Sequence, residues 1–363
     1  MKIKKLNPFF LVALMAMSVG SRGNAAQVLQ SPGPLAFAPG GVLVAADPKA
    51  AALVAIKTGD AASSGGAALN VAGINAKIAA LLGTSADAIR IVDLAVNPES
   101  HHAYLSVARG RGANADAVIV KCNGEGDLSV VTVDPANVSR VTLPNAPADK
   151  VTGEGRRARN QRLESITDIS YVDGNVIVAG LSNEEFASTL RSVPFPFSAA
   201  ENGASVEIYH GAHGRFETRS PVRTFVPYTI EGQKHILAAY TCTPLVKVPV
   251  AQLKPGAHVK GTTIAELGNR NRPLDMLVYN KDGKDWFLMA NSSRGIMKIS
   301  TSDLAGAPGI TDRVGGGGTQ GQAFETIDSW KNVYQLAEYD RQHALVVRDG
   351  VDGALDLVAL AYP

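Results

Sequence analysis

The chain has 363 residues, of which 45% are hydrophobic and 19% are charged, and its formal net charge is +2. This length is sufficient for one large domain with an extensive core. Because the net charge is close to zero, the composition gives no indication of nucleic acid or an anionic membrane surface as a partner. The 36 glycines and 19 prolines, with few long helical patterns, favour an all-β fold rich in turns.

Residues 1–25 have the parts of a bacterial secretory signal peptide. Three lysines stand among the first five residues, residues 8–19 form an apolar run, and small residues follow at 23–25. The run is shorter than the about 20 residues that a membrane-spanning helix needs. We therefore expect cleavage near Ala25 and a periplasmic or secreted domain of residues 26–363 without a membrane span.

A unit of three apolar strands joined by tight turns is the first repeating feature. Its expected strands and the candidate for a fourth are at residues 35–38, 42–45, 53–56 and 67–71. Residues 74–89 then break the β pattern, because their apolar side chains have the spacing of one helix face. We predict a short helix that ends at Gly83 and covers one end of the fold.

Similar units follow along the chain. Their first strands are expected near Val92, Ile166, Thr224, Leu274 and Ile327. In the second unit residues 128–133 are the outer strand, and in the third unit a 20-residue insertion at 184–203 precedes the third strand at 206–209. The units recur at intervals of roughly 50 to 75 residues, a repeat length typical of four-stranded antiparallel propeller blades.

Several short motifs match one known type of blade. They are Asp168, the turns Asp173-Gly174-Asn175 and Asp282-Gly283, and the pair Asn291-Ser292. In these motifs the chain resembles the six- to seven-bladed propellers of the NHL and YVTN-repeat kind. The resemblance implies an all-β propeller of six blades, or of seven if the insertions contain one more, and it singles out no specific family.

Four aspartates stand early in expected first strands: Asp93, Asp168, Asp275 and Asp328. The first strand of a blade lines the central channel, so these carboxyls are expected near one end of that channel. One interpretation is structural, because a buried carboxylate can accept hydrogen bonds from the backbone of the neighbouring blade. The other is that they contribute to a ligand site.

Polar turns that follow the second strands are expected on the same face, because the second strand runs back to the end where the first begins. The residues concerned are Arg109, Asn183, Cys242, Asn291 and Arg294. Together with the aspartates they predict a polar rim that binds an unidentified protein or small-molecule ligand. We expect the protein to act as a monomer.

A metal site at this rim is the more specific alternative. Lactonase-type propellers hold an ion with Glu, Asn and Asp, and the resemblance implies Glu164, Asn291 and Asp275 here, with Asn183 and Asp328 as substitutes. Oxygen ligands of this kind suit Ca²⁺ or Mg²⁺. The test is whether the three groups converge at about 2.3–2.6 Å from one ion.

The cysteines and histidines predict no further site. Cys122 and Cys242 fall in non-neighbouring units, so we expect no disulfide between them. A zinc or copper site would need three histidines to converge. The seven histidines, among them His210 and His213 on either side of Gly211-Ala212, are therefore expected to be solvated or hydrogen-bonded.

Two classes of function remain from the sequence. The leading prediction is a binding or scaffold protein that uses the polar rim of its channel. The alternative is an enzyme, namely a hydrolase or lactonase that depends on Ca²⁺ or Mg²⁺. A quinone-type oxidoreductase is less favoured, because the chain has two tryptophans and no cofactor motif.

Overall fold

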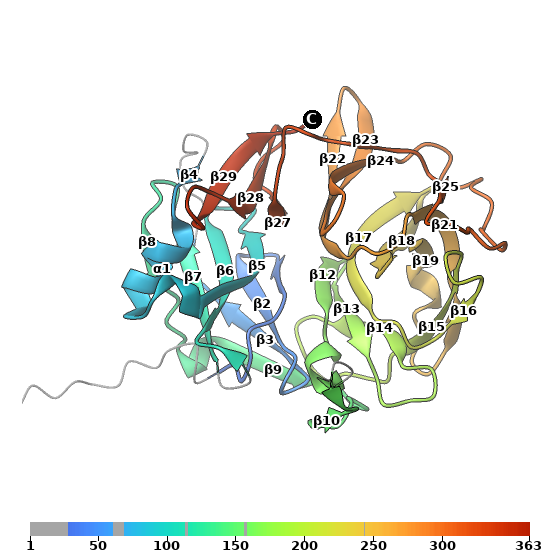
Figure 1. The fold of residues 1–363 in the computed structure, drawn as a ribbon. Helices are drawn as coiled ribbons and strands as arrows, with labels where there is room; N and C mark the ends of the chain where they lie inside the picture. Colours follow the sequence, from blue (N-terminus) through green and yellow to red (C-terminus); the bar gives the residue numbers. More distant parts are fainter. Residues whose placement is uncertain (1–27, 61–68, 113–114, 156–157, 243) are drawn as a thin grey trace, which may run out of the picture.

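The computed structural model describes residues 28–60, 69–112, 115–155, 158–242 and 244–363. Their strands form six antiparallel blades around a central channel, which confirms the expected six-bladed propeller with one short α-helix (Figure 1). The expected signal peptide lies outside the described residues. Among those residues, no helix has both the length and the apolar character that a bilayer crossing requires.

The blades are named here by their order along the chain, each with its inner strand first. Blade A consists of β1 (Leu35–Ala38), β2 (Val42–Asp47), β3 (Ala52–Lys57) and β9 (Val138–Thr142), and blade B of β5 (Ile89–Val96), β6 (Ala103–Arg109), β7 (Asp116–Cys122) and β8 (Leu128–Val130). Blade C consists of β12 (Asp168–Val172), β13 (Asn175–Leu181), β14 (Ser188–Pro194), β15 (Ala204–His210) and β16 (Arg215–Glu217), with β20 (His258–Lys260) parallel to β15.

The remaining blades complete the ring. Blade D consists of β17 (Val222–Ile230), β18 (Gln233–Tyr240), β19 (Pro244–Pro249), β21 (Thr262–Leu267) and β25 (Thr319–Gly321). Blade E consists of β22 (Pro273–Lys281), β23 (Lys284–Asn291), β24 (Gly295–Ser300) and β26 (Phe324–Thr326), and blade F of β27 (Val333–Glu338), β28 (His343–Asp349), β29 (Leu355–Ala361) and β4 (Asn70–Val71). Outside the blades lie the pair β10 (Val151–Thr152) and β11 (Arg159–Asn160), the helix α1 (Ile74–Leu82) and 3₁₀ turns at Ala86–Ala88, Pro135–Asn137, Gln161–Glu164 and Val250–Gln252.

The order of the blades around the ring differs from their order in the chain. The inner strand β1 lies between β5 and β12, and β5 lies between β1 and β27, so the ring reads A, C, D, E, F, B (Figure 1). After β3 the chain leaves blade A, adds β4 to the outer edge of blade F, builds blade B, and returns with β9 to complete blade A. Segments from both halves of the chain therefore close the ring.

This path corrects the expectation for residues 67–71. They were expected as the fourth strand of the first unit, but β4 pairs with β29, with Val71 opposite Leu357. The fourth strand of blade A is β9 instead. Alternating apolar residues identify a strand, but they do not identify its partner.

Two further boundaries differ from the sequence analysis. Residues 188–194, expected inside an insertion, form β14, the third strand of blade C. In the last unit, the inner strand begins at Val333, and residues 324–326 form the outer strand of blade E. The prediction that Asp328 belongs to an inner strand is therefore wrong, because it is an exposed residue of the turn between β26 and β27.

The core is divided among the six contacts between adjacent blades. Successive side chains of a strand point to opposite faces of the sheet, so each blade supplies residues to two neighbouring cores. In β13, Val176 and Val178 pack against blade A, whereas Ile177 and Ala179 pack against blade D. Each blade thus depends on both neighbours, as in other stacked repeats.

The helix α1 confirms the predicted element and its end. Gly83 takes a left-handed conformation with φ of 66°, and its N–H points to the carbonyls of Ala79 and Ala80. Ile74 and Ile78 are fully buried in the core that blades B and F share. The helix therefore packs across the junction between these two blades.

Candidate functional site

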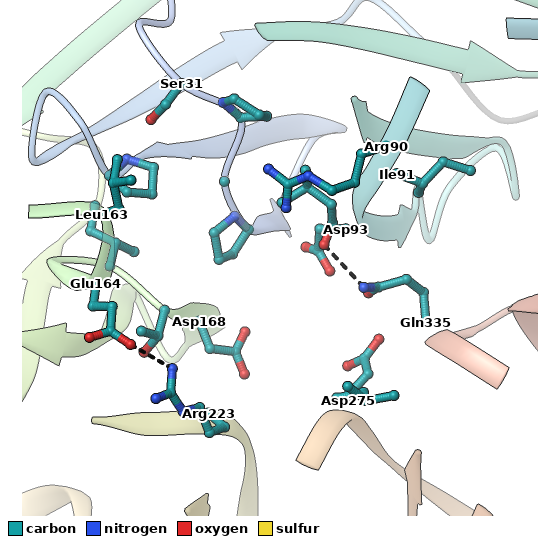
Figure 2. Close-up of a pocket in the computed structure, with 18 of the residues that line it drawn as sticks. Ser31, Arg90, Ile91, Asp93, Leu163, Glu164, Asp168, Arg223, Asp275 and Gln335 are labelled. Atoms are coloured by element: carbon teal, nitrogen blue, oxygen red, sulfur yellow. Dashed lines mark hydrogen bonds and ion pairs between the residues drawn. The ribbon is translucent and has the colours of Figure 1, made fainter. Parts of the chain in front are cut away.

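A cavity of about 970 Å³ opens at the face where the inner strands begin, here called the start face (Figure 2). The first residues of β5 and β22 line it, together with the segments that lead into the inner strands of blades A and C. A smaller cavity of about 360 Å³, lined by later residues of the same inner strands, opens on the opposite face. Asp93, Asp168 and Asp275 line both cavities. These three residues, here called the carboxyl ring, therefore lie in the channel between the two cavities.

Each carboxyl of the ring joins two adjacent blades. The backbone N–H of Leu35 donates to Asp93 Oδ2 at 2.6 Å, and that of Phe225 donates to Asp168 Oδ2 at 2.8 Å. The N–H of Leu336 donates in the same way to Asp275 Oδ2 at 2.6 Å. The carboxyls of the ring thus link blade B to blade A, blade C to blade D, and blade E to blade F. The structural interpretation of these aspartates has direct support in these bonds.

The carboxyls of the ring share an unusual protonation behaviour. Burial raises the pKa of Asp93 to about 8, and the nearby carboxyl of Asp168 contributes to this rise. Burial also raises the pKa of Asp168 to about 7. For Asp275, burial and then the carboxyl of Asp93 raise the pKa well above its ordinary value. The backbone donors oppose these effects, but near neutral pH the ring retains protons and can donate hydrogen bonds to a ligand.

Arginines surround the opening above the ring. Arg90, Arg223 and Arg272 line the cavity, and Figure 2 shows Arg90 and Arg223 near the carboxyl ring. The carboxylate of Glu164 accepts a hydrogen bond from Arg223 Nη1 at 2.8 Å. Burial, and then the positive charge of Arg223, lowers the pKa of Arg272. Among the described residues, the guanidinium groups of Arg90 and Arg272 have no hydrogen-bond or ion-pair partner.

The other residues predicted for the rim lie at the ends of second strands or in the turns after them, but none lines the cavity. Arg109, at the end of β6, forms an ion pair with Asp116 at 2.6 Å. Asn183 is exposed, and its N–H donates to the carbonyl of Asn145. Cys242 takes a φ of 63° and is half-buried.

The last two rim residues are Asn291, which ends β23, and Arg294 in the turn that follows. Asn291 is buried, donates to Asn271 Oδ1 at 3.1 Å and accepts from the backbone N–H groups of Ser293 and Arg294. These bonds shape the turn. Cys122 and Cys242 are both free, which confirms that they form no disulfide.

The residues proposed for a Ca²⁺ or Mg²⁺ site have separate partners. Glu164 pairs with Arg223, and Asp275 accepts from the backbone N–H groups of Met276 and Leu336. Asn291 precedes the turn described above and lies outside the cavity. A guanidinium beside Glu164 would repel a divalent cation. This geometry gives the metal hypothesis no added support.

Sequence reasoning did not identify Arg90, Arg223, Arg272 and Gln335 as cavity residues. Gln335 donates from Nε2 to the carbonyl of Val92 at 3.0 Å, across the junction of blades F and B (Figure 2). A signal was present, because Arg90 and Arg272 each stand three residues before an aspartate of the ring. Basic residues at the start of several inner strands must lie around the same opening.

In sequence, the chain matches no protein-family model and no curated protein. In structure, it is similar to several solved proteins at low identity. A putative oxidoreductase (glucose dehydrogenase) from Thermus thermophilus is 11% identical, with a TM-score of 0.36, over 91% of this chain and 96% of that one.

Two aldose sugar dehydrogenases are comparably distant. The PQQ-bound enzyme from Streptomyces coelicolor is 13% identical, with a TM-score of 0.29, over 94% of this chain and 96% of that one. The soluble apo enzyme from Escherichia coli is 11% identical, with a TM-score of 0.28, over 93% of this chain and 97% of that one. These similarities are too low to carry an argument about activity, so the function must be argued from the site.

Proposed function

We propose that this protein is an exported binding protein that takes up a small anionic ligand in the start-face cavity. The observation that carries the proposal is a pair of guanidinium groups, Arg90 and Arg272, which form no hydrogen bond or close ion pair among the described residues and line a cavity of about 970 Å³. That volume is at the upper end of the about 300–1,000 Å³ typical of small-molecule sites. Export after cleavage near Ala25 is part of the proposal and has its own test, the N-terminal sequence of the purified protein.

The charges around the opening favour an acidic group on the ligand. Guanidinium groups bind carboxylate and phosphate through paired hydrogen bonds. Glu164 forms an ion pair with Arg223, and its charge also acts on Arg272, so one carboxylate faces three guanidinium groups. A ligand carboxylate or phosphate would supply the negative charge that these groups lack.

The carboxyl ring then determines which groups of a ligand can bind deeper in the channel. Because burial raises the pKa of Asp93 to about 8 and that of Asp168 to about 7, Asp93 is mostly protonated and Asp168 partly protonated near neutral pH, so the ring offers hydrogen-bond donors. Hydroxyl and carbonyl oxygens of a ligand can accept from them. The cavity is therefore suited to a hydroxylated organic acid or a sugar phosphate.

Thermal unfolding in the presence of gluconate, citrate and glucose 6-phosphate tests the proposal. A ligand that binds only the folded protein raises the melting temperature by mass action. At least one of the three probes is expected to do so, and the double variant Arg90→Gln/Arg272→Gln is expected to abolish the shift. Arg341→Gln, an exposed arginine between β27 and β28 outside this cavity, is the matched control and should leave the shift unchanged.

Two results would oppose the proposal. One is the absence of a shift with all three probes. The other is an equal shift in the wild type and in the double variant, since binding would then occur elsewhere on the protein.

A further inference from the structure

A second polar cluster lies at the hairpin of β15 and β16, away from the carboxyl ring. His210 ends β15, Glu217 ends β16, and His213 stands in the turn between them. The hairpin pairs Glu217 with Ile208, two residues before His210, so Glu217 and His210 project from the same face. Gly214, with a φ of 66°, allows the tight turn that brings His213 back over the hairpin.

The three side chains are already in mutual contact. Nδ1 of His210 lies 3.0 Å from Glu217 Oε2, and Nδ1 of His213 lies 2.7 Å from Glu217 Oε1. The two imidazole rings lie against each other at a tilt of 38°, with their centroids 3.9 Å apart. One potential ligand atom from each residue lies within 4.8 Å of those of the other two.

Burial differs across the cluster in a way that favours a ligand. His210 is only 2% exposed, and its Nε2 has no hydrogen-bond partner among the described residues. The side chain of His213 is 46% exposed, so an ion can approach from solvent. An ion would bind Nδ1 of His210, the ring nitrogen that faces Glu217, and Nε2 on the other side of the ring would not contact it.

The donor set has a clear chemical preference. The carboxylate of Glu217 lies within hydrogen-bond distance of both imidazoles and accepts from the hydroxyl of Ser220. The guanidinium of Arg215 lies 3.4 Å from Oε1 of Glu217, but its side chain is 72% exposed and can turn toward solvent, which leaves the carboxylate available as a ligand. Two imidazoles and one carboxylate suit Zn²⁺, Cu²⁺ or Ni²⁺, whereas Ca²⁺ and Mg²⁺ prefer oxygen ligands alone.

The spacing is close to what such an ion needs. Ligand atoms about 2.0–2.1 Å from a tetrahedral zinc ion are about 3.3 Å from one another. The nitrogen–oxygen separations of 3.0 and 2.7 Å in the cluster are slightly shorter. The ligand atoms of the two histidines lie within 4.8 Å of each other, so a metal could replace the two shared protons after the side chains adjust around it.

We propose that His210, His213 and Glu217 bind one divalent transition-metal ion, with a water molecule at the solvent side beside His213. The site is independent of the start-face cavity and of the Ca²⁺ or Mg²⁺ hypothesis. Histidines alone did not indicate it in the sequence, because the third ligand is a glutamate that the hairpin pairing brings alongside.

Zinc titration of chelator-treated, untagged protein by calorimetry tests this inference. We expect one equivalent of Zn²⁺ to bind with micromolar or tighter affinity, and excess Ca²⁺ not to compete. His213→Gln alters an exposed side chain, so it should leave the fold intact and weaken Zn²⁺ binding by at least about 10-fold, the lower limit for loss of a supporting group at metal sites. Glu217→Gln should weaken it to a similar degree.

Two control variants locate the zinc. His258→Gln removes another exposed histidine of blade C, one that lies 3.9 Å from Glu207, and it should bind Zn²⁺ like the wild type. Cys242→Ser should also bind normally, which excludes the free thiol as the ligand. Absence of zinc binding by the wild type would overturn the proposal, as would unchanged affinity in His213→Gln or equal weakening in His258→Gln.

Discussion

Replacement of one carboxyl of the ring by its neutral amide tests how the channel is built. Asp93→Asn keeps a side-chain oxygen that can accept from the N–H of Leu35 but removes the ionisable group. Because burial raises the pKa of Asp93 to about 8 in the folded protein, the folded state holds a proton that the unfolded state has lost above about pH 4. The carboxyl therefore contributes stability at low pH, and this contribution declines as the pH rises toward 8.

The size of the effect follows from proton linkage. Over the interval in which only the folded state is protonated, stability falls by about 1.4 kcal/mol for each pH unit. Between pH 5 and pH 7 a carboxyl of this kind should therefore cost the wild type about 3 kcal/mol of unfolding free energy, and the neighbouring carboxyls of the ring share in this pH dependence. Asp93→Asn should lack this part of the pH dependence and should exceed the wild type in stability at pH 7–8.

Urea unfolding at pH 5, 6, 7 and 8 measures the difference. Asp352→Asn, at an exposed turn position whose positive φ asparagine tolerates, is the control and should follow the wild type. Parallel stability curves for the wild type and Asp93→Asn would refute the reasoning. So would a large loss of stability at pH 8 in Asp93→Asn, because it would mean that an ionised carboxylate holds blade A.

Three further predictions concern other parts of the fold. Asp60 accepts hydrogen bonds from Ser100 and Tyr104 and contacts His102. Burial alone would raise the pKa of Asp60, but these interactions lower it. The stability that the Asp60 carboxylate contributes is therefore present near neutral pH and is lost as the pH falls through the lowered pKa. Asp60→Asn should therefore be less stable than the wild type in urea at pH 7, and the difference should shrink below about pH 4; a constant difference would contradict this account. Phe287→Ala removes a fully buried ring from the core between blades D and E and should cost about 3–5 kcal/mol in the same assay, whereas a loss below about 1 kcal/mol would mean that the core collapses around it. Glu164→Gln removes the carboxylate that neutralises Arg223, so it should strengthen binding of the anionic probes in the thermal-shift assay; weaker binding, together with loss of any Ca²⁺-dependent stabilisation, would instead favour the metal hypothesis.

The local pattern of the sequence was sufficient to predict the blades. The turn at Asp282-Gly283, with positive φ at both residues, joins β22 and β23 as the residue types indicated. The alternation of apolar residues predicted the boundaries of most inner and second strands to within a few residues. The helix and its end at Gly83 followed from apolar spacing and from glycine in the left-handed region. These features depend on interactions between residues close in the chain.

The sequence also placed three aspartates that line the start-face cavity, for a general reason. Asp93, Asp168 and Asp275 stand early in inner strands, and all inner strands of a propeller begin on one face. Asp328 failed this rule because residues 324–326 have the composition of a strand but pair as the outer edge of blade E. An edge strand and an inner strand can have the same local pattern, and only the partner distinguishes them.

Tertiary structure alone decided the ring order and the protonation of the carboxyls. Blade B closes the ring between blades F and A because β4 and β9 find partners far away in the chain. The raised pKa of Asp93 depends on burial and on a carboxyl from another blade. Strand formation is a local property, whereas strand partners, burial and the proximity of charges arise from contacts between distant segments, which the chain order does not specify.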